Sequence, residues 1–247
     1  MNRSGIYRTL ATGLMALALS LPTASTAFAR QEETVDTSGR FRVEVGGVFG
    51  KGLNREYVAD SDTGEPIYIG AGGGAGLAVT MGYGLTKRFD IDVSAVRQRS
   101  VNKTNLINGE MEFKKTFLLG SLKYKITVPP TLDLYGGQIK IGAGLGLYQA
   151  TELTITHNDL VTGASSYIIV DYEPTLGYHG SLEFETIMPN DWSLSLGTRV
   201  YFVDFKADST NTSGIFAANP TFVPVSRFQE MRGSGVDFLI TLGKYFW

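Results

Sequence analysis

One histidine of this chain stands in a pattern that could do chemistry. His179 and Ser181 are followed at the same spacing by Glu183 and Glu185. Alternate residues of a β-strand share one face, so a strand here places a base, a hydroxyl and two carboxylates side by side. Such a set is the raw material of acyl transfer, in which a histidine activates a serine. Neighbours along one strand provide no obvious oxyanion hole, however, and we favour a polar ladder that lines an interior.

The other candidates for a metal or cofactor site are weak. The chain has no cysteine and two histidines, which excludes thiolate ligands and a histidine-rich site. His157 lies in a segment that we interpret as a solvated loop. Asp60, Asp62 and Glu65 form an acidic, turn-rich stretch rather than a calcium loop. The glycines at 72–74 precede no helix that would hold a phosphate. We predict neither a metal nor a cofactor.

The segments that must position these side chains have the period-2 alternation of β-strands. In residues 77–84 apolar side chains alternate with small or polar ones, and the alternation resumes in residues 89–95. Two such strands joined by a tight turn make a β-hairpin. The same unit recurs along the chain. Eight strands are expected in all, at 41–49, 77–84, 89–95, 118–126, 139–148, 176–184, 193–202 and 236–247.

The connections between these strands alternate in length. Three are short or moderate (85–88, 127–138 and 188–192), and four are long and polar or glycine-rich (50–72, 100–111, 156–167 and 208–235). Apolar strand faces, with short turns at one end and long loops at the other, are typical of a membrane β-barrel. We therefore predict an all-β fold, an eight-stranded antiparallel up-and-down transmembrane β-barrel, over residues 39–247.

The strand faces opposite the apolar ones carry charged side chains. If the apolar faces point outward, these charges lie inside the barrel. Both signs are present, and buried charges are tolerated when they are paired. Because the lumen of a small barrel is filled by side chains, we predict an internal network of salt bridges. Its members are Arg42, Glu44, Asp90, Asp92, Lys123, Lys125, Lys140, Glu152, Glu183, Glu185, Arg199 and Asp237.

The last strand ends in three aromatic residues, Tyr245, Phe246 and Trp247. Aromatic rings favour the interface of a membrane. We expect Tyr245 and Trp247 in a belt near the short turns, and Tyr172 in one near the long loops. The phase of the last strand is ambiguous because Lys244 interrupts its apolar face. Either Lys244 reaches the interface with its amine, or a bulge near Gly243 switches the phase.

The first residues have the order of an export signal. Arg3 and Arg8 precede an apolar stretch, and the small residues Ala27 and Ala29 frame a cleavage site. We predict a signal peptide over residues 1–29 and a short linker over residues 30–38. The formal net charge of the full chain is −2, which argues against a nucleic-acid partner.

These features resemble the eight-stranded outer-membrane β-barrel superfamily that includes the OmpA transmembrane domain, OmpX and OmpW. The resemblance rests on the signal peptide, the hairpin at 77–93 with its turn entry at 83–86, the alternating glycines of 142–146 and the terminal aromatic residues. It implies a monomer in the outer membrane, in contact with lipid and lipopolysaccharide. It also implies a membrane-insertion signal, read by the barrel-insertion machinery, at Tyr245, Phe246 and Trp247.

The resemblance leaves three functions open. The first, which we favour, is a structural or surface-interaction role, with four long outer loops displayed on a charge-filled, non-porous barrel. The second is an OmpW-like conduit for small apolar solutes. The third is a lipid A acyl hydrolase similar to the PagL type, whose His-x-Ser pair matches His179 and Ser181, with Glu183 as the acid. We expect no enzyme, because strand alternation turns these side chains inward, away from lipid.

Overall fold

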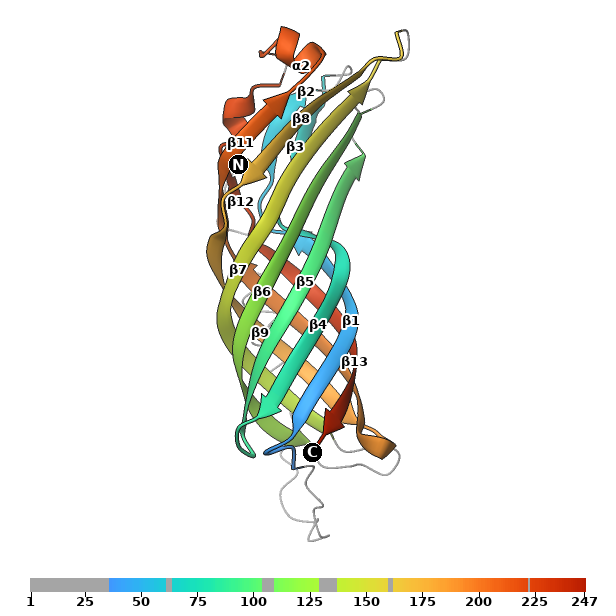
Figure 1. The fold of residues 1–247 in the computed structure, drawn as a ribbon, viewed down its shortest axis with the longest axis vertical. Coiled ribbons are helices and arrows are strands. Elements are labelled where there is room, and N and C mark those ends of the chain that lie inside the picture. Colours follow the sequence, from blue (N-terminus) through green and yellow to red (C-terminus); the bar gives the residue numbers. More distant parts are fainter. Residues whose placement is uncertain (1–35, 61–63, 104–108, 129–136, 160–161, 222) are drawn as a thin grey trace. The chain divides into compact units, whose positions relative to one another are not determined.

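The computed structural model describes residues 36–60, 64–103, 109–128, 137–159, 162–221 and 223–247. The predicted signal peptide, residues 1–29, lies outside the described residues, as does most of the predicted linker. Eight strands form one closed antiparallel barrel (Figure 1), which confirms the predicted fold class. In the described part of the chain, no helix has the length and apolarity that crossing a membrane requires.

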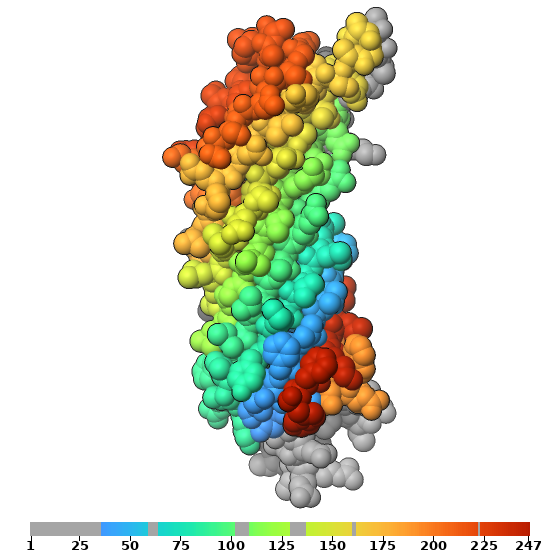
Figure 2. Space-filling model, in the orientation of Figure 1, coloured from blue at the N-terminus to red at the C-terminus, as the bar shows by residue number. Residues whose placement is uncertain are grey.

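The barrel strands follow one another around the ring in chain order. They are β1 (Phe41–Gly52), β4 (Gly73–Gly84), β5 (Phe89–Lys103), β6 (Gly109–Val128), β7 (Gly137–Asn158), β9 (Thr175–Ile187), β10 (Trp192–Phe202) and β13 (Gly235–Phe246). The last strand closes on the first, with Phe246 opposite Phe41 and Gly235 opposite Gly52. On one face, the slanted bands of β4 to β7 lie side by side (Figure 2).

The two ends of the barrel differ. The end with the connection 85–88 and the short 3-10 helix η1 (Pro189–Asp191) is called the turn end here, and the opposite one the loop end. At the loop end, β5, β6 and β7 continue beyond the ring and are joined by further elements. These are β2 (Glu56–Asp60), β3 (Pro66–Ile69), β8 (Ser165–Tyr172), β11 (Asp204–Thr212), β12 (Glu230–Arg232), helix α2 (Ile215–Ala218) and the 3-10 helix η2 (Val225–Phe228).

This loop-end extension is a sheet rather than a set of loops. Strand β8 pairs with the second half of β7, β11 pairs with β8, and β12 pairs with β11. Strands β2 and β3 form a separate hairpin. Large parts of the segments predicted as long loops are therefore paired strands, and their inward side chains, such as Ile168, Val170 and Phe205, are buried.

The strands change phase where the barrel passes into the extension. On β7, Ala150 has a φ of 46°, and the register with β6 shifts between Lys114 and Thr116. Such a bulge adds one residue and reverses which face points inward. Strands β8 and β9 are separated at Pro174, which has no N–H for a ladder. Tyr172 consequently points inward and is buried, so its predicted place in a membrane belt is wrong.

The outward face of the barrel is apolar over most of its height. Its exposed side chains include Val45, Leu77, Val79, Met81, Ile91, Val93, Leu118, Leu122, Ile141, Leu145, Leu182, Leu196, Ile240 and Leu242. At the turn end, aromatic pairs cap this band, with Phe89 and Tyr124 ring centroids 5.4 Å apart. A soluble protein rarely exposes so large an apolar surface. The barrel is built to face hydrocarbon.

The last strand keeps one phase to its end. Its register with β1 is continuous from Gly235 to Phe246, so no bulge lies near Gly243. Lys244 points outward, where its Nζ donates to the carbonyl of Asn190 at 3.1 Å and lies over the Trp192 ring. The long lysine stem lets the amine reach polar groups at the turn end. Tyr245 is buried, so its predicted place in the outer belt is wrong.

Candidate functional site

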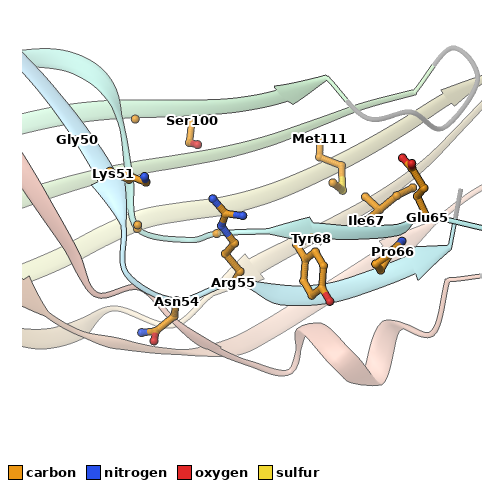
Figure 3. Close-up of a pocket in the computed structure, with 14 residues that line it drawn as sticks. Gly50, Lys51, Asn54, Arg55, Glu65, Pro66, Ile67, Tyr68, Ser100 and Met111 are labelled. Carbon is orange, nitrogen blue, oxygen red and sulfur yellow. The ribbon is translucent and has the colours of Figure 1, made fainter. Parts of the chain in front are cut away.

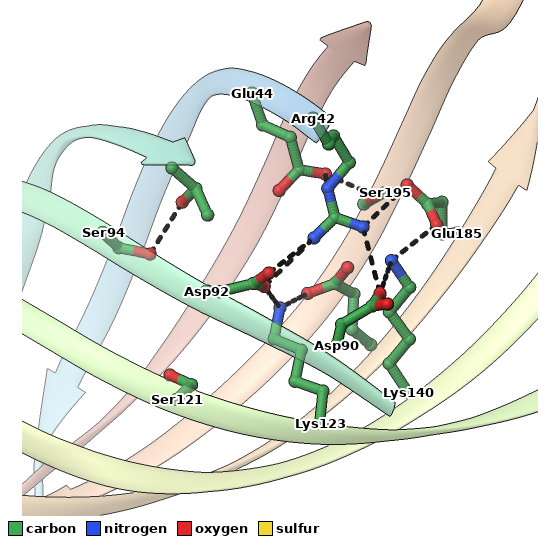
Figure 4. A network of polar contacts seen from close by, with 12 residues as sticks. Arg42, Glu44, Asp90, Asp92, Ser94, Ser121, Lys123, Lys140, Glu185 and Ser195 are labelled. Carbon is green, nitrogen blue, oxygen red and sulfur yellow. Dashed lines mark hydrogen bonds and ion pairs between the residues drawn. The ribbon is translucent and has the colours of Figure 1, made fainter. Parts of the chain in front are cut away.

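Arg42 is the centre of a buried charge cluster in the turn-end half of the lumen (Figure 4). It lies on the inner face of β1. Its guanidinium nitrogens are 3.0 Å from the carboxylate of Asp92, 3.3 Å from Glu185, 3.4 Å from Glu44 and 3.7 Å from Asp90. A guanidinium carries five N–H donors in a rigid plane, so one arginine can serve several carboxylates at once.

Two lysines pair with two of these carboxylates, Asp92 and Glu185, from the opposite side of the lumen. Lys123 Nζ lies 2.7 Å from Asp92 and 2.6 Å from Glu183. Lys140, which is fully buried, reaches Glu185 at 2.7 Å. The contact between Lys123 and Glu183 is a charge-assisted hydrogen bond, which is stronger than a neutral one, and the other two are close ion pairs.

Lys125 and Tyr245 complete the cluster toward the turn end. Lys125 Nζ lies 2.6 Å from Asp90 and donates to Thr37 Oγ1 at 2.8 Å. The Tyr245 hydroxyl donates to Glu185 at 2.8 Å. Thr37 belongs to the predicted linker, yet it is buried at the turn end of the barrel. Tyr245, which the sequence predicted to lie at the membrane interface, thus forms hydrogen bonds with charged side chains of the lumen.

Small residues leave room for these long side chains. A side chain at Gly142 would come within 2.9 Å of Lys123 Cγ, and one at Gly82 within 3.1 Å of an Arg42 nitrogen. The structure brings nine of the twelve predicted lumen residues into this cluster. Its described members are four cations, Arg42, Lys123, Lys125 and Lys140, and five carboxylates, Glu44, Asp90, Asp92, Glu183 and Glu185.

A second polar layer lies nearer the loop end. Arg199 forms an ion pair with Asp237, and Gln98 Nε2 donates to Asp237 at 2.8 Å. Lys115 Nζ donates to the Tyr201 oxygen at 2.7 Å. All five side chains are buried. The second layer therefore holds two further predicted lumen residues, Arg199 and Asp237, apart from the cluster around Arg42.

Sequence reasoning missed three members of this layer. Gln98, Lys115 and Tyr201 lie on inner faces of β5, β6 and β10. The signal for Lys115 was present, because it is eight residues before Lys123 on the same strand and therefore shares its face. The predicted strand began too late, at Leu118, to use that signal.

Glu152, the twelfth predicted residue, lies outside both layers. It follows the bulge at Ala150, which turns Thr151 and Leu153 inward in its place. Its carboxylate is only partly buried and lies 3.2 Å from Lys114 Nζ on the neighbouring strand. The prediction for Glu152 was wrong because it continued the strand alternation through Ala150. The sequence does not mark the bulge there, which moves Glu152 off the inner face.

His179 and Ser181 line a small polar chamber between the two layers. His179 Nε2 lies 2.9 Å from Ser121 Oγ, and the chamber volume is about 40 Å³. Among the described residues, neither His179 Nδ1 nor Ser181 Oγ has a hydrogen-bond partner. Glu183 is paired with Lys123. A serine nucleophile needs its base within hydrogen-bond reach, and the predicted nucleophile Ser181 has no such partner in the described part of the chain, since His179 pairs with Ser121 instead. The geometry instead suits a polar ladder with space for about one water.

Comparison with known proteins identifies the fold. No protein-family model matches the chain, and no curated protein matches it. Among solved structures, the outer membrane protein OprG from Pseudomonas aeruginosa aligns over 85% of this chain and 97% of its own, with TM-score 0.51 and 16% identity. This is the fold of the eight-stranded outer-membrane barrels. Neisserial surface protein A also aligns over 85% of this chain and 100% of its own (TM-score 0.45, 13% identity), as does Ail of Yersinia pestis, over 85% and 99% (TM-score 0.43, 9% identity). The likeness concerns the barrel architecture.

Proposed function

We propose that this chain is a non-enzymatic outer-membrane barrel with a surface-interaction role, in which a charge-filled barrel anchors the loop-end extension outside the membrane. The apolar outward band supports a membrane location. The paired charges around Arg42 support a closed lumen, because a filled interior leaves little path for a solute. The part of the protein that is available for an interaction is then the surface of the loop-end extension.

The observation that carries this proposal is the apolar core inside the extension. Met111, Phe113, Leu153, Ile155, Ile168, Val170, Phe205, Phe228 and Met231 are each almost completely buried. Phe113 and Phe205 ring centroids are 5.5 Å apart. Packed cores give well-defined structures. The extension is therefore suited to present a fixed surface rather than a set of mobile loops.

We also propose that one segment near each end of the chain is a targeting signal. Residues 1–29 serve as a cleaved signal peptide for export. Tyr245, Phe246 and Trp247 serve as the membrane-insertion signal for the barrel-insertion machinery. Phe246 and Trp247 are exposed at the turn end, where another protein can reach them. We propose a monomer, surrounded by lipid and lipopolysaccharide, because the ring closes within one chain.

The same geometry argues against two alternative functions. An OmpW-like conduit for small apolar solutes needs an apolar path through the lumen, and the layers around Arg42 and Asp237 lie across it. A PagL-type hydrolase needs His179 and Ser181 at the lipid face, whereas both lie on the inner face of β9.

The experiment combines surface labelling with solute flux. The chain has no cysteine, so single cysteines can be placed at Asn158, in the loop-end extension, and at Lys87, exposed at the turn end. We expect a membrane-impermeant maleimide to label Asn158→Cys on intact cells and Lys87→Cys only after lysis. We expect vesicles that carry the protein to admit small solutes no faster than empty vesicles. Labelling of Lys87→Cys alone on intact cells, or rapid flux, would refute the proposal.

Enzyme activity has a separate test. The lipid A of cells that express the wild-type protein is compared by mass spectrometry with the lipid A of cells that express His179→Ala or Ser181→Ala. We expect identical spectra. A loss of one acyl chain that depends on both residues would establish the hydrolase instead.

A further inference from the structure

A polar pocket opens at the loop-end rim of the barrel (Figure 3). Its volume is about 460 Å³. It is enclosed by the end of β1, the hairpin β2–β3, the glycine-rich segment 70–74 and the inner faces of β5 and β6. Pockets of about 300–1,000 Å³ are the usual size of small-molecule sites. We call this the rim pocket, and it is separate from the chamber at His179.

The lining of the rim pocket carries more positive than negative charge. Lys51 and Arg55 both line it and are both exposed. Neither forms an ion pair with another residue that the structure describes, whereas the nearby Arg99 and Lys114 are both paired with Glu112. Two cations without such partners beside a concave surface attract an anion. Phosphate oxygens suit both side chains, because they accept charge-assisted hydrogen bonds.

The rest of the lining suits a sugar ring. Tyr68 presents a half-exposed aromatic face, and Asn54 and Ser100 supply an amide and a hydroxyl. Glu65, drawn at the end of the pocket away from Lys51, adds a carboxylate (Figure 3). Aromatic faces pack against the C–H faces of a sugar, while amides, hydroxyls and carboxylates bond its hydroxyl groups.

The floor of the rim pocket is fixed by the polar layer beneath it. The Gly73 N–H donates to the Tyr201 oxygen at 2.7 Å, and Gln98 donates to the Gly74 carbonyl at 3.1 Å. Gly73 and Gly74 have φ values of 83° and 112°, which other residues rarely adopt. The pocket is thus formed before any ligand arrives, which lowers the cost of binding.

The position of the rim pocket suggests where its ligand comes from. Phe49 and Leu77 are exposed on the outward faces of β1 and β4, next to the strand ends that line the pocket. The pocket therefore lies at the edge of the apolar band, at the level of lipid headgroups if the proposed function holds. We propose that the rim pocket binds a phosphorylated sugar, with Lys51 and Arg55 on the phosphate and Tyr68 on the sugar ring. Both a glycolipid headgroup and a free sugar phosphate have this chemistry.

The test uses the full-length protein in lipid nanodiscs and isothermal titration calorimetry. The probes are glucose 1-phosphate, glucose and inorganic phosphate. We expect glucose 1-phosphate to bind at least tenfold more tightly than either of the others. The double variant Lys51→Ala/Arg55→Ala weakens this binding at least tenfold. Tyr68→Leu removes the preference over inorganic phosphate. The control Lys87→Ala/Arg88→Ala removes two cations at the turn end and leaves binding unchanged.

Nanodiscs that contain lipopolysaccharide distinguish the two sources. If lipopolysaccharide blocks glucose 1-phosphate from the wild-type protein, the occupant is a glycolipid; if it does not, the occupant is a free sugar phosphate. Equal binding of all three probes, no binding at about 10 mM ligand, or an unchanged affinity in Lys51→Ala/Arg55→Ala would overturn the proposal. Heat-modifiable gel mobility shows that each variant is folded. The labelling at Asn158 reports separately on the proposed function, so the two can fail independently.

Discussion

Replacement of Arg42 by methionine is the sharpest perturbation of the buried cluster. Methionine keeps much of the side-chain volume and removes the charge. Most partners of Arg42 retain another cation. Asp92 keeps Lys123 at 2.7 Å, and Glu185 keeps Lys140 at the same distance. Among the residues that the structure describes, Glu44 retains only the Ser195 hydroxyl, which donates to it at 3.2 Å. The variant therefore leaves one buried carboxylate, that of Glu44, without a cation.

The expected loss in the free energy of unfolding follows from this one unpaired carboxylate. Removing one partner of a buried ion pair destabilises a protein by about 3–5 kcal/mol. The cluster already has one more carboxylate than it has cations, so Glu44→Gln alone should change the free energy of unfolding by no more than about 1 kcal/mol. The double variant Arg42→Met/Glu44→Gln no longer has the stranded charge. We expect it to regain about 2 kcal/mol or more relative to Arg42→Met, which is a coupling of the size found for contacting residues.

The assay is reversible urea unfolding of the purified barrel in lipid vesicles, followed by the fluorescence of Trp192 and Trp247. Lys87→Met is the matched control, because Lys87 pairs with Asp36 at an exposed site and should change stability by less than about 1 kcal/mol. A loss below about 1 kcal/mol in Arg42→Met, or strictly additive effects of Arg42→Met and Glu44→Gln, would refute the reasoning. Either result would mean that water, rather than Arg42, solvates Glu44.

Three further outcomes are expected. Tyr201→Phe removes the oxygen that accepts from Lys115 and from the Gly73 amide; urea unfolding should show a loss of about 1–3 kcal/mol, and an unchanged midpoint would contradict the assigned bonds. Gly74→Ala places a Cβ 2.6 Å from the Arg99 carbonyl oxygen at a φ of 112°. The same assay should therefore show that the free energy of unfolding falls by about 1–3 kcal/mol. Wild-type stability of this variant would mean that the rim is not rigid. Trp247→Ala removes a ring that lies under the Arg40 guanidinium at 4.1 Å; we expect fewer heat-modifiable barrels in outer membranes, and wild-type assembly would remove Trp247 from the insertion signal.

Much of the barrel could be predicted from local pattern. Whether a side chain such as Lys123 or Leu122 points inward is set by its immediate neighbours along the strand, because successive residues of a strand alternate between faces. The alternation therefore predicted the apolar outward face and the polar lumen. The same pattern placed His179 and Ser181 on the inner face of a strand.

The phase changes could not be predicted in this way. Ala150 and Pro174 interrupt the alternation at the base of the extension, and beyond them the inward set is reversed. A one-residue shift moves every later side chain to the other face. Glu152 and Tyr172 were misplaced for this reason. In the last strand the alternatives at Lys244 were resolved only by its continuous register with β1.

The sequence by itself determined which residues face inward along each unbroken strand, since that periodicity is local. Tertiary structure decided which of them meet. Arg42 and Glu185 are 143 residues apart, and they touch because β13 closes on β1 and β9 on β7. The rim pocket likewise combines Lys51, Tyr68 and Ser100 from three separate segments. Such pairings depend on the register of the whole closed ladder, which no single stretch of sequence specifies.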